Sequence, residues 1–447
     1  MKIRKKILSG NIVLLILIFM SLGVVTPSNA ANSANMRLEI EWEHYFGGSE
    51  GDAAHSIIQS SDGGFTILGL TESYGAGRFD IWLIKTNASG HHEWNKTFGG
   101  IHFDWPSKGN SLIQTQDDGY AFKGYTQGWN ESGQIANEKF LMKTDSKGIQ
   151  KWNYTVEGSA GSTVIQTTDS GYVLLETINR DNESETQDLV LLKIDSSGNY
   201  VWNQTIYTFN GEVLVGPLIQ TIDGGYTLLG SLGEYPDHDF LLIKIDSVGL
   251  AEWNKTYSRK NFNVGASVIQ LADGCFILAG TSGYVGYLST GYAVDNSEIW
   301  LIKTDVTGDP VWNTTLGFTS SNEEVTSMIQ TADGGFLLAG ITDKYSVDSA
   351  WLAKTDSDGK LEWEMKIGED NKHVIESVLQ TADGGYVLAG STGNPLHGGA
   401  GDMWLLKVQV TEGTTTTTDD GSPGFEFSLV FLCLVLIILT TRKRRLV

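Results

Sequence analysis

The sequence predicts an all-β fold, a seven-bladed β-propeller of four-stranded blades in which the N-terminal strand completes the last blade and closes the ring. Two repeated phrases predict it. A twelve-residue phrase of the form Ile-Gln-Thr-x-Asp-Gly-Gly-Tyr recurs seven times, starting at positions 58, 113, 165, 219, 269, 329 and 379. A second phrase, typified by IWLIKTDVTGDPVW (299–312), follows six of these copies. Self-similarity at a period of about 50 residues indicates an array of supersecondary units.

Each unit contains the signals for four short strands. The first strand ends at Ile-Gln, and an Asp-Gly turn, which supplies the positive φ angles of a tight hairpin, joins it to a strand led by Phe or Tyr. The third strand contains a Lys, and the fourth begins at a Trp nine residues after that Lys. The third-strand lysines are Lys85, Lys143, Lys193, Lys244, Lys303, Lys354 and Lys407. We expect each of them to pair with the Asp of a neighbouring turn, and the Trp rings to fill the space between blades.

The two ends of the repeat array favour a closed ring over an open solenoid. The seventh unit stops at MWLLKVQV (403–410) before its Trp, whereas RLEIEWEHYFGG (37–48) matches the fourth-strand phrase HHEWNKTFGG (91–100) with no unit before it. Trp42 therefore supplies the Trp that the seventh unit lacks. An open solenoid needs capping repeats, and the sequence contains none.

The termini predict export and anchoring. We assign residues 1–30 to a signal peptide, because a basic start, an apolar run and Ser-Asn-Ala precede a cleavage site after Ala30. The remaining parts are a propeller (31–410), a Thr-rich linker (411–424), an apolar transmembrane or sorting helix (425–441) and a basic cytoplasmic tail (442–447).

The tail also carries a resemblance. SPGFEF (422–427), the apolar run and RKRR (442–445) resemble the PGF-type C-terminal sorting signals of archaeal surface proteins, especially the versions in Asgard archaea. That resemblance implies that a membrane protease-transpeptidase removes the tail and that the mature protein is anchored at the cell surface. An ordinary C-terminal membrane anchor is the alternative, and both place the propeller at the outer face of the cell membrane.

Composition excludes some functions. The net charge of −22 disfavours nucleic-acid binding, which needs a positive face. The two cysteines are Cys275 and Cys433, and the second lies in the apolar tail, so no disulfide forms within the propeller. The sequence contains no Gly-x-Ser-x-Gly, His-Glu-x-x-His, P-loop or metal-ligand spacing, and we predict no catalytic residue, cofactor or metal.

The spacing of the repeats predicts where a ligand would bind. The turn between the first two strands and the Lys-to-Trp segment have constant length, whereas the segments from Gln to Lys and from Trp to the next Gln vary. Alternate connections emerge on opposite sides of a blade, so all variable sequence falls on one face, where binding loops are expected. The candidate ligand-binding residues there are Trp105, Trp129, Tyr284, Tyr287, Tyr292, His55, Asp104 and His373. The aromatic ones could instead pack down and rigidify their own loops.

Glycosylation is expected in the loops. Asn130 and Asn182 stand in Asn-x-Ser sequons within loops, which makes them better acceptors than the sequons that the repeat places just after its Trp.

KTDSDGKLEW (354–363) is similar to the tryptophan-docking repeat of pyrroloquinoline-quinone-type propellers. That resemblance implies a shared way of packing blades and does not imply the cofactor. Two classes of function follow for the variable face. We favour a non-catalytic surface module that binds a glycan, a peptide or a surface protein, and the alternative is a secreted propeller enzyme that acts on polysaccharide, of hydrolase or lyase type. Two carboxylates roughly 5–10 Å apart in an aromatic cleft would favour the enzyme.

Overall fold

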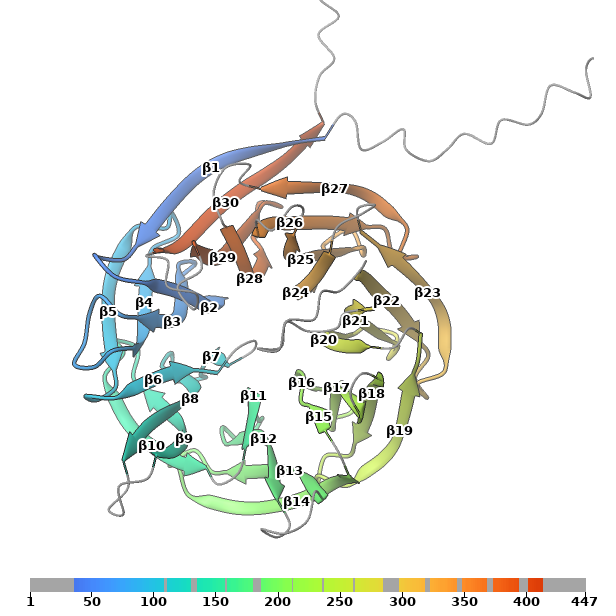
Figure 1. Ribbon diagram of the computed structural model, residues 1–447, viewed down its shortest axis with the longest axis horizontal. Coiled ribbons are helices and arrows are strands. Elements are labelled where there is room, and N and C mark those ends of the chain that lie inside the picture. The colour runs from blue at the N-terminus through green and yellow to red at the C-terminus, as the bar shows by residue number, and fades with distance from the viewer. Residues whose placement is uncertain are drawn as a thin grey trace, which may run out of the picture. The chain divides into compact units, whose positions relative to one another are not determined.

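The structure is a computed structural model that describes most of the repeat region. The described residues are 36–107, 111–129, 135–156, 159–179, 186–210, 212–234, 237–259, 262–283, 297–317, 322–343, 348–367, 373–393 and 401–412. These residues form β-strands and no helix, and the strands make seven antiparallel sheets arranged as the blades of a ring (Figure 1). The predicted seven-bladed propeller is confirmed. Contacts divide the chain into two units, Met1–Thr411 and Glu412–Val447, and only Glu412 of the second is described.

The strands follow the repeat, with the first strand of each blade facing the ring centre and the fourth outermost (Figure 1). Blade 1 contains β2 (Asp52–Gln59), β3 (Phe65–Thr71), β4 (Asp80–Thr86) and β5 (His92–Phe98). Blade 2 contains β6 (Phe103–Pro106), β7 (Leu112–Gln114), β8 (Tyr120–Trp129), β9 (Ile135–Thr144) and β10 (Gln150–Val156). Blade 3 contains β11 (Ser159–Gln166), β12 (Tyr172–Asn179), β13 (Thr186–Ile194) and β14 (Tyr200–Asn210). Blade 4 contains β15 (Glu212–Leu214), β16 (Leu218–Gln220), β17 (Tyr226–Glu234), β18 (Asp237–Ile245) and β19 (Ala251–Tyr257).

The last three blades complete the ring. Blade 5 contains β20 (Asn263–Gln270), β21 (Phe276–Ser282), β22 (Glu298–Thr304) and β23 (Pro310–Leu316). Blade 6 contains β24 (Asn322–Gln330), β25 (Phe336–Asp343), β26 (Asp348–Thr355) and β27 (Leu361–Ile367). Blade 7 contains β28 (His373–Gln380), β29 (Tyr386–Thr392), β30 (Met403–Glu412) and the N-terminal β1 (Met36–Phe46).

The ring closes where the sequence predicts. Blade 7 has the strand order β1-β30-β29-β28, so β1 is its outermost strand. Side chains reinforce this pairing, because the Trp404 indole donates to Glu43 at 2.7 Å and the Lys407 ammonium lies 2.9 Å from the Glu41 carboxylate. Trp42 then reaches blade 1, where its ring centroid lies 5.9 Å from that of Phe65. The N-terminal strand thus clasps the ring shut.

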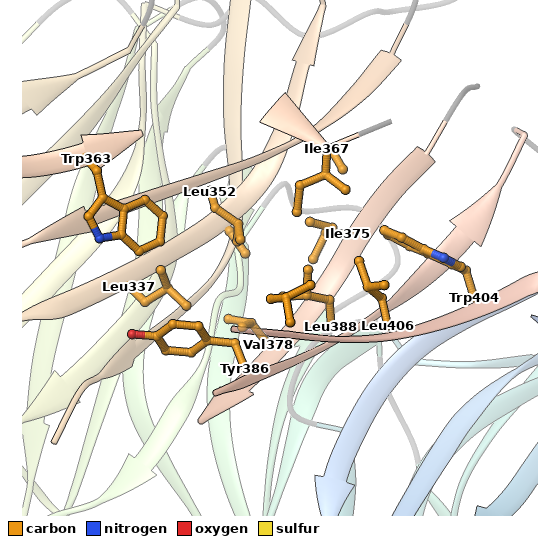
Figure 2. Packing of buried hydrophobic residues seen from close by; sticks show 13 residues of the cluster. Leu337, Leu352, Trp363, Ile367, Ile375, Val378, Tyr386, Leu388, Trp404 and Leu406 are labelled. Carbon is orange, nitrogen blue, oxygen red and sulfur yellow. The ribbon is translucent and has the colours of Figure 1, made fainter. Parts of the chain in front are cut away.

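Blade-to-blade seams are filled by the repeat aromatics, as expected. The Trp94 ring meets the Tyr120 ring of the next blade edge-on at 5.9 Å, and Trp152 meets Tyr172 in the same way at 5.4 Å. Between blades 6 and 7, Trp363 and Tyr386 pack with a cluster of buried aliphatic side chains (Figure 2). Apolar burial between blades therefore supplies the core.

The repeat Gln has a role that the sequence did not reveal. The side-chain oxygen of Gln114 in blade 2 accepts the backbone N–H of Ser61 in blade 1 at 2.7 Å. Gln270 accepts from Ile222 and Gln380 from Ala332 in the same way, both at 2.8 Å. Each of these glutamines joins its blade to the turn of the preceding blade, which explains why the repeat retains an amide there.

The third-strand lysines pair as predicted, with one exception. Each of six lysines forms an ion pair with the first Asp of the turn between the first two strands of its own blade: Lys85–Asp62, Lys143–Asp117, Lys193–Asp169, Lys244–Asp223, Lys354–Asp333 and Lys407–Asp383. Among the described residues, Lys303 of blade 5 forms no such pair. The lysine ring is therefore part of the scaffold at the tight-turn end of the blades.

The innermost strands are interrupted at one level. Blades 1, 5, 6 and 7 have a register shift there, next to His55, Ala266, Thr326 and Glu376. In blades 2 and 4 the strand is split in two, and Pro106 and Pro217 lie at the breaks. A bulge bends a strand and re-aims a side chain, and Pro cannot donate to a β-ladder, so both devices interrupt pairing at the same level.

Candidate functional site

Four aromatic side chains gather on the variable face where blades 1 and 2 meet. Phe103 and Trp105 lie two apart on β6, so they share one face of that strand. In the register of the sheet, Trp105 pairs with Tyr125 of β8, and Phe79, just before β4, forms a parallel bridge with Phe103. Local strand geometry therefore brings together residues from two blades. We call Phe79, Phe103, Trp105 and Tyr125 the aromatic row.

The rings of the aromatic row stack on one another. The Phe103 and Trp105 rings are nearly parallel, at 4° with centroids 5.1 Å apart, and Tyr125 lies 5.1 Å from Trp105 on the row's continuation. The guanidinium of Arg78 sits 5.4 Å from the Phe103 centroid at the other end. All four rings are half-buried, and the neighbouring Ile101 is 77% exposed. Trp105 packs on its neighbours and also contributes to an apolar strip open to solvent, and its role in ligand binding stays a prediction.

Two carboxylates lie buried behind this row. Asp104 lies between Phe103 and Trp105 in β6 and accepts the Gly100 N–H at 2.9 Å. Asp80 accepts two backbone N–H groups at 3.0 Å, from Ala76 and Gly77. A Cβ on Gly99 would lie 2.3 Å from one Asp80 oxygen and 2.6 Å from one Asp104 oxygen, so both carboxylates converge on this glycine.

Electrostatics around this pair oppose ionisation of Asp80. Burial raises the pKa of Asp80, and the nearby negative charge of Asp104 raises it further, against the effect of the two backbone donors. Both side chains are nearly inaccessible, with Asp80 1% and Asp104 2% exposed. The two carboxylates accept backbone N–H groups of Ala76, Gly77 and Gly100 in the connections next to the aromatic row. These hydrogen bonds hold the connections in place.

Asp104 occupies a position that recurs in other blades. In five blades, the innermost strand carries a polar residue opposite the position two residues after the second-strand glycine: Asp52, Asp104, Asn263, Glu323 and His373. All five are buried. Blade 4 has Val213 at this position. Sequence reasoning found Asp104 and His373 but missed that they are equivalent, although the phrase Phe-Gly-Gly-x-x-x-Asp at 46–52 and 98–104 carried part of the signal. It also missed Phe79, Phe103 and Tyr125, because their proximity depends on strand register.

Only some of the other predicted site residues are described. His55 is buried at the register shift of β2, and the His373 ring packs at a tilt against Trp404 with centroids 4.6 Å apart. Trp129 ends β8. Tyr284, Tyr287, Tyr292, Asn130 and Asn182 lie outside the described residues. Within the described ranges no three His, Cys, Asp or Glu side chains are grouped so that they could hold a metal ion.

No protein-family model matches this chain, and no curated protein does. Among solved structures, a protein of unknown function from Dyadobacter fermentans matches with a TM-score of 0.47 and 9% identity over 84% of this chain and 99% of its own. The polysaccharide lyase Uly1 matches with a TM-score of 0.47 and 10% identity over 81% and 90% of the two chains. A Synechocystis apocarotenoid oxygenase mutant gives 0.43 and 11% over 83% and 96%. Likenesses this remote carry no information on activity.

Membrane attachment is a separate matter from the propeller. In the ranges that the structure describes, no helix has the length and hydropathy needed to cross a bilayer. The predicted signal peptide and the predicted apolar tail both lie outside these ranges.

Proposed function

We propose that this protein is a non-catalytic cell-surface module that binds a glycan through the aromatic row of blades 1 and 2. The observation that carries the proposal is the continuous stack of Phe103, Trp105 and Tyr125, which is half-exposed on the face with variable connections. Aromatic surfaces bind the apolar C–H faces of sugar rings, and a surface held by a rigid scaffold loses little entropy on binding.

The surroundings of the row support a binding role over catalysis. Asp80 and Asp104 are closed off from solvent and hold backbone N–H groups, so neither can reach a glycosidic bond without unfolding its turn. A peptide or a surface protein could also use an apolar strip. We favour a glycan because the row presents aromatic carbon and few hydrogen-bonding groups, which suits the C–H groups of pyranose rings better than a peptide backbone, whose N–H and C=O groups need partners.

A glycan array probed with the purified protein tests this proposal. We expect binding to at least one glycan class, and Tyr125→Ala or Trp105→Ala should weaken it about tenfold or more. Tyr200→Ala is the matched control, because Tyr200 is 54% exposed at the opposite, tight-turn end of blade 3. Full binding by both row variants would place the ligand elsewhere, and no binding to any glycan would count against this class of ligand.

A polysaccharide-cleaving enzyme is the second candidate, because the Asp80–Asp104 pair lies directly behind the row. An enzyme of this kind would need a carboxylate to act as acid or base. Asp104→Asn should then abolish release of reducing or unsaturated ends from the polysaccharide that the array identifies. Under the binding proposal no such release occurs with the unmodified protein.

We further propose that the propeller is displayed at the outer face of the cell membrane. The signal-like start and the Pro-Gly-Phe tail support this placement. Mass spectrometry of the mature protein from its native cells distinguishes the two tail mechanisms. Loss of residues after about Gly424 indicates processing by a transpeptidase, whereas an intact basic tail indicates a retained membrane anchor.

A further inference from the structure

A hollow lies at the tight-turn end of the propeller, where the turns of blades 4 and 5 meet. It has a volume of about 330 Å³, which is enough for one long side chain. Among its lining residues, Ile222, Asp223 and Lys244 come from blade 4, and Asp273, Phe276 and Val306 come from blade 5. The aromatic row stands on the other, variable face, so the hollow is a separate feature of the molecule.

Asp273 is the carboxylate at this hollow that no lysine pairs with. In each of the other six blades, the turn Asp forms an ion pair with the third-strand Lys of the same blade. Among the described residues Asp273 forms no ion pair, although the charge of Lys303 is near enough to act on it. The Cys275 N–H, which Asp273 accepts at 3.0 Å, and to a smaller extent Lys303 lower the pKa of Asp273. This exposed carboxylate is therefore ionised at neutral pH and open to a cation from outside.

The other polar groups at the hollow are already paired. The buried Lys244 ammonium lies 2.8 Å from the Asp223 carboxylate and 3.1 Å from that of Glu252. The Gln270 side chain accepts the Ile222 N–H at 2.8 Å and donates to the Gly274 carbonyl at 3.2 Å. An incoming cation therefore meets one available carboxylate, whereas an incoming anion meets more carboxylates than ammonium groups.

Large aliphatic side chains stand exposed beside this carboxylate. Ile222 is 69% exposed and Val306 is 54% exposed, and both line the hollow. The other six blades carry Ser, Thr, Gln or Ala at the position of Ile222, and the five others that have the turn of Val306 carry Ser or Ala there. Val248, on a turn of blade 4, is also exposed. Exposed apolar side chains that gather at one place, next to a charge, are typical of protein-binding surfaces.

We propose that this hollow docks a Lys or Arg side chain of a basic partner protein, with its cationic end on Asp273 and apolar neighbours of that side chain covering Ile222 and Val306. Lys and Arg carry a cation on an apolar stem, which matches a carboxylate set among aliphatic side chains. The net charge of −22 attracts basic partners. The exposed aliphatic rim gives a protein surface more to cover than a small free cation covers, and the proposal does not depend on glycan binding.

Capped tripeptides Leu-Lys-Leu and Leu-Arg-Leu, titrated into the full-length chain, test the proposal. In protein with 13C-labelled isoleucine methyl groups, Ile222 is the NMR signal that disappears in Ile222→Ser. We expect this signal to shift with peptide concentration. The same peptide with norleucine in place of the basic residue should bind at least fivefold more weakly, and 0.5 M NaCl should weaken binding of the basic peptides. A stationary Ile222 signal, or equal affinity for the norleucine peptide, would overturn the proposal.

Two variants with matched controls locate the contact. Asp273→Asn can still accept the Cys275 N–H, and it should weaken peptide binding about fivefold. Asp358→Asn removes the same charge from an exposed turn of blade 6 and should leave binding unchanged. Ile222→Ser places in blade 4 the residue that blade 1 has as Ser61, and it should also cost about fivefold. Its control is Ile149→Ser, because Ile149 is exposed on a turn of blade 2 and does not line the hollow. Equal losses in a variant and its control would contradict the assignment.

A last comparison decides between a protein and a small molecule as the source of the cation. Butylammonium carries the charge and stem of Lys without the apolar neighbours, so it should bind at least fivefold more weakly than the tripeptides. Equal affinity would show that the hollow takes a free cation and that protein docking is wrong. Trp105→Ala should leave peptide binding unchanged, and a loss there would place the peptide on the aromatic row instead.

Discussion

The two ends of each blade differ in how far they repeat. At the tight-turn end, the same hydrogen bond closes the first turn of blades 1 and 6, from Gly63 to Ser60 and from Gly334 to Thr331, both at 2.9 Å. At the variable end, the recurring buried position holds Asp52 in blade 1, Glu323 in blade 6 and His373 in blade 7. The contrast teaches that one end is kept constant for packing and pairing, while the other can change without loss of the ring.

This division assigns different consequences to mutation at each end. Changes at the tight-turn end should lower stability and leave glycan binding intact, because Lys–Asp pairs, Gln bridges and Trp seams lie there. Changes at the aromatic row should weaken ligand binding and leave stability intact. The predictions below test this division, beginning with the strand on which both ends depend.

Removal of β1, residues 36–46, should have the largest effect. It would leave blade 7 without its outer strand, expose the Trp404 seam and leave Lys407 without Glu41. We expect the melting temperature to fall by on the order of 10 °C or more, measured by calorimetry. A melting curve that matches the native one would show that the ring does not depend on its clasp. Arg37→Ala, at an exposed position of the same strand, is the control.

The second largest effect should come from acid, which weakens the Lys–Asp ion pairs at the tight-turn end. The Lys193 ammonium and the Thr167 hydroxyl lower the pKa of Asp169 to about 2, and Lys407 with Thr381 lowers that of Asp383 to the same value. Because these folded-state values lie below the unfolded value of about 3.9, the stability they contribute is present above pH 4 and is lost as the pH falls toward 2.

Melting temperatures measured from pH 7 to pH 2 check this expectation. The two turn carboxylates are half exposed or more, so each pair contributes little and the decline should be gradual. Asp169→Asn should make the fall of the melting temperature with pH less steep, because this variant lacks one of the carboxylates that acid protonates. A melting temperature that stays constant down to pH 2.5 would contradict the role given to these pairs.

The repeat explains why so much of the fold could be predicted. Turn glycines, strand lengths and the unpaired Trp42 are local features, and the ring follows from counting them. Site residues were harder, because Phe79 and Phe103 come together only through a bridge between two blades, and the repeat Gln acts on a backbone group about 50 residues away. Trp105 and Asp104 were found because they stand in an insertion.

Lys354→Met compared with Lys303→Met should give a smaller and more selective effect. Lys354 is buried and lies 2.9 Å from both Asp333 and Glu362, whereas Lys303 forms no ion pair among the described residues. We expect about 1–2 kcal/mol of destabilisation at Lys354 and less than about 0.5 kcal/mol at Lys303, measured by denaturant unfolding. Equal losses would show that the ion pairs do not set the contribution of the ammonium group, because Met keeps most of the apolar stem of Lys.

The smallest effect should come from Cys275→Gly. In the Asp-Gly-Gly turns, the second glycine lies close to the third-strand Lys. A Cβ on Gly335 would lie 2.1 Å from the Thr355 carbonyl oxygen and 2.5 Å from the Lys354 Nζ, so a side chain at this position crowds the lysine. Cys275 occupies this position in blade 5, and its N–H still bonds Asp273 at 3.0 Å, so the turn survives although Lys303 forms no ion pair among the described residues.

Restoring the glycine should let Lys303 reach Asp273 and raise stability by about 0.5 kcal/mol, the usual size of a partly exposed pair. Cys275→Ala separates this effect from loss of the thiol, since it keeps the Cβ that excludes the lysine, and should leave stability unchanged. In the Cys275→Gly background, Lys303→Met should lower the free energy of unfolding by as much as Cys275→Gly raised it. A Gly variant no more stable than the Ala variant would show that the missing pair in blade 5 has another cause than the side chain at position 275.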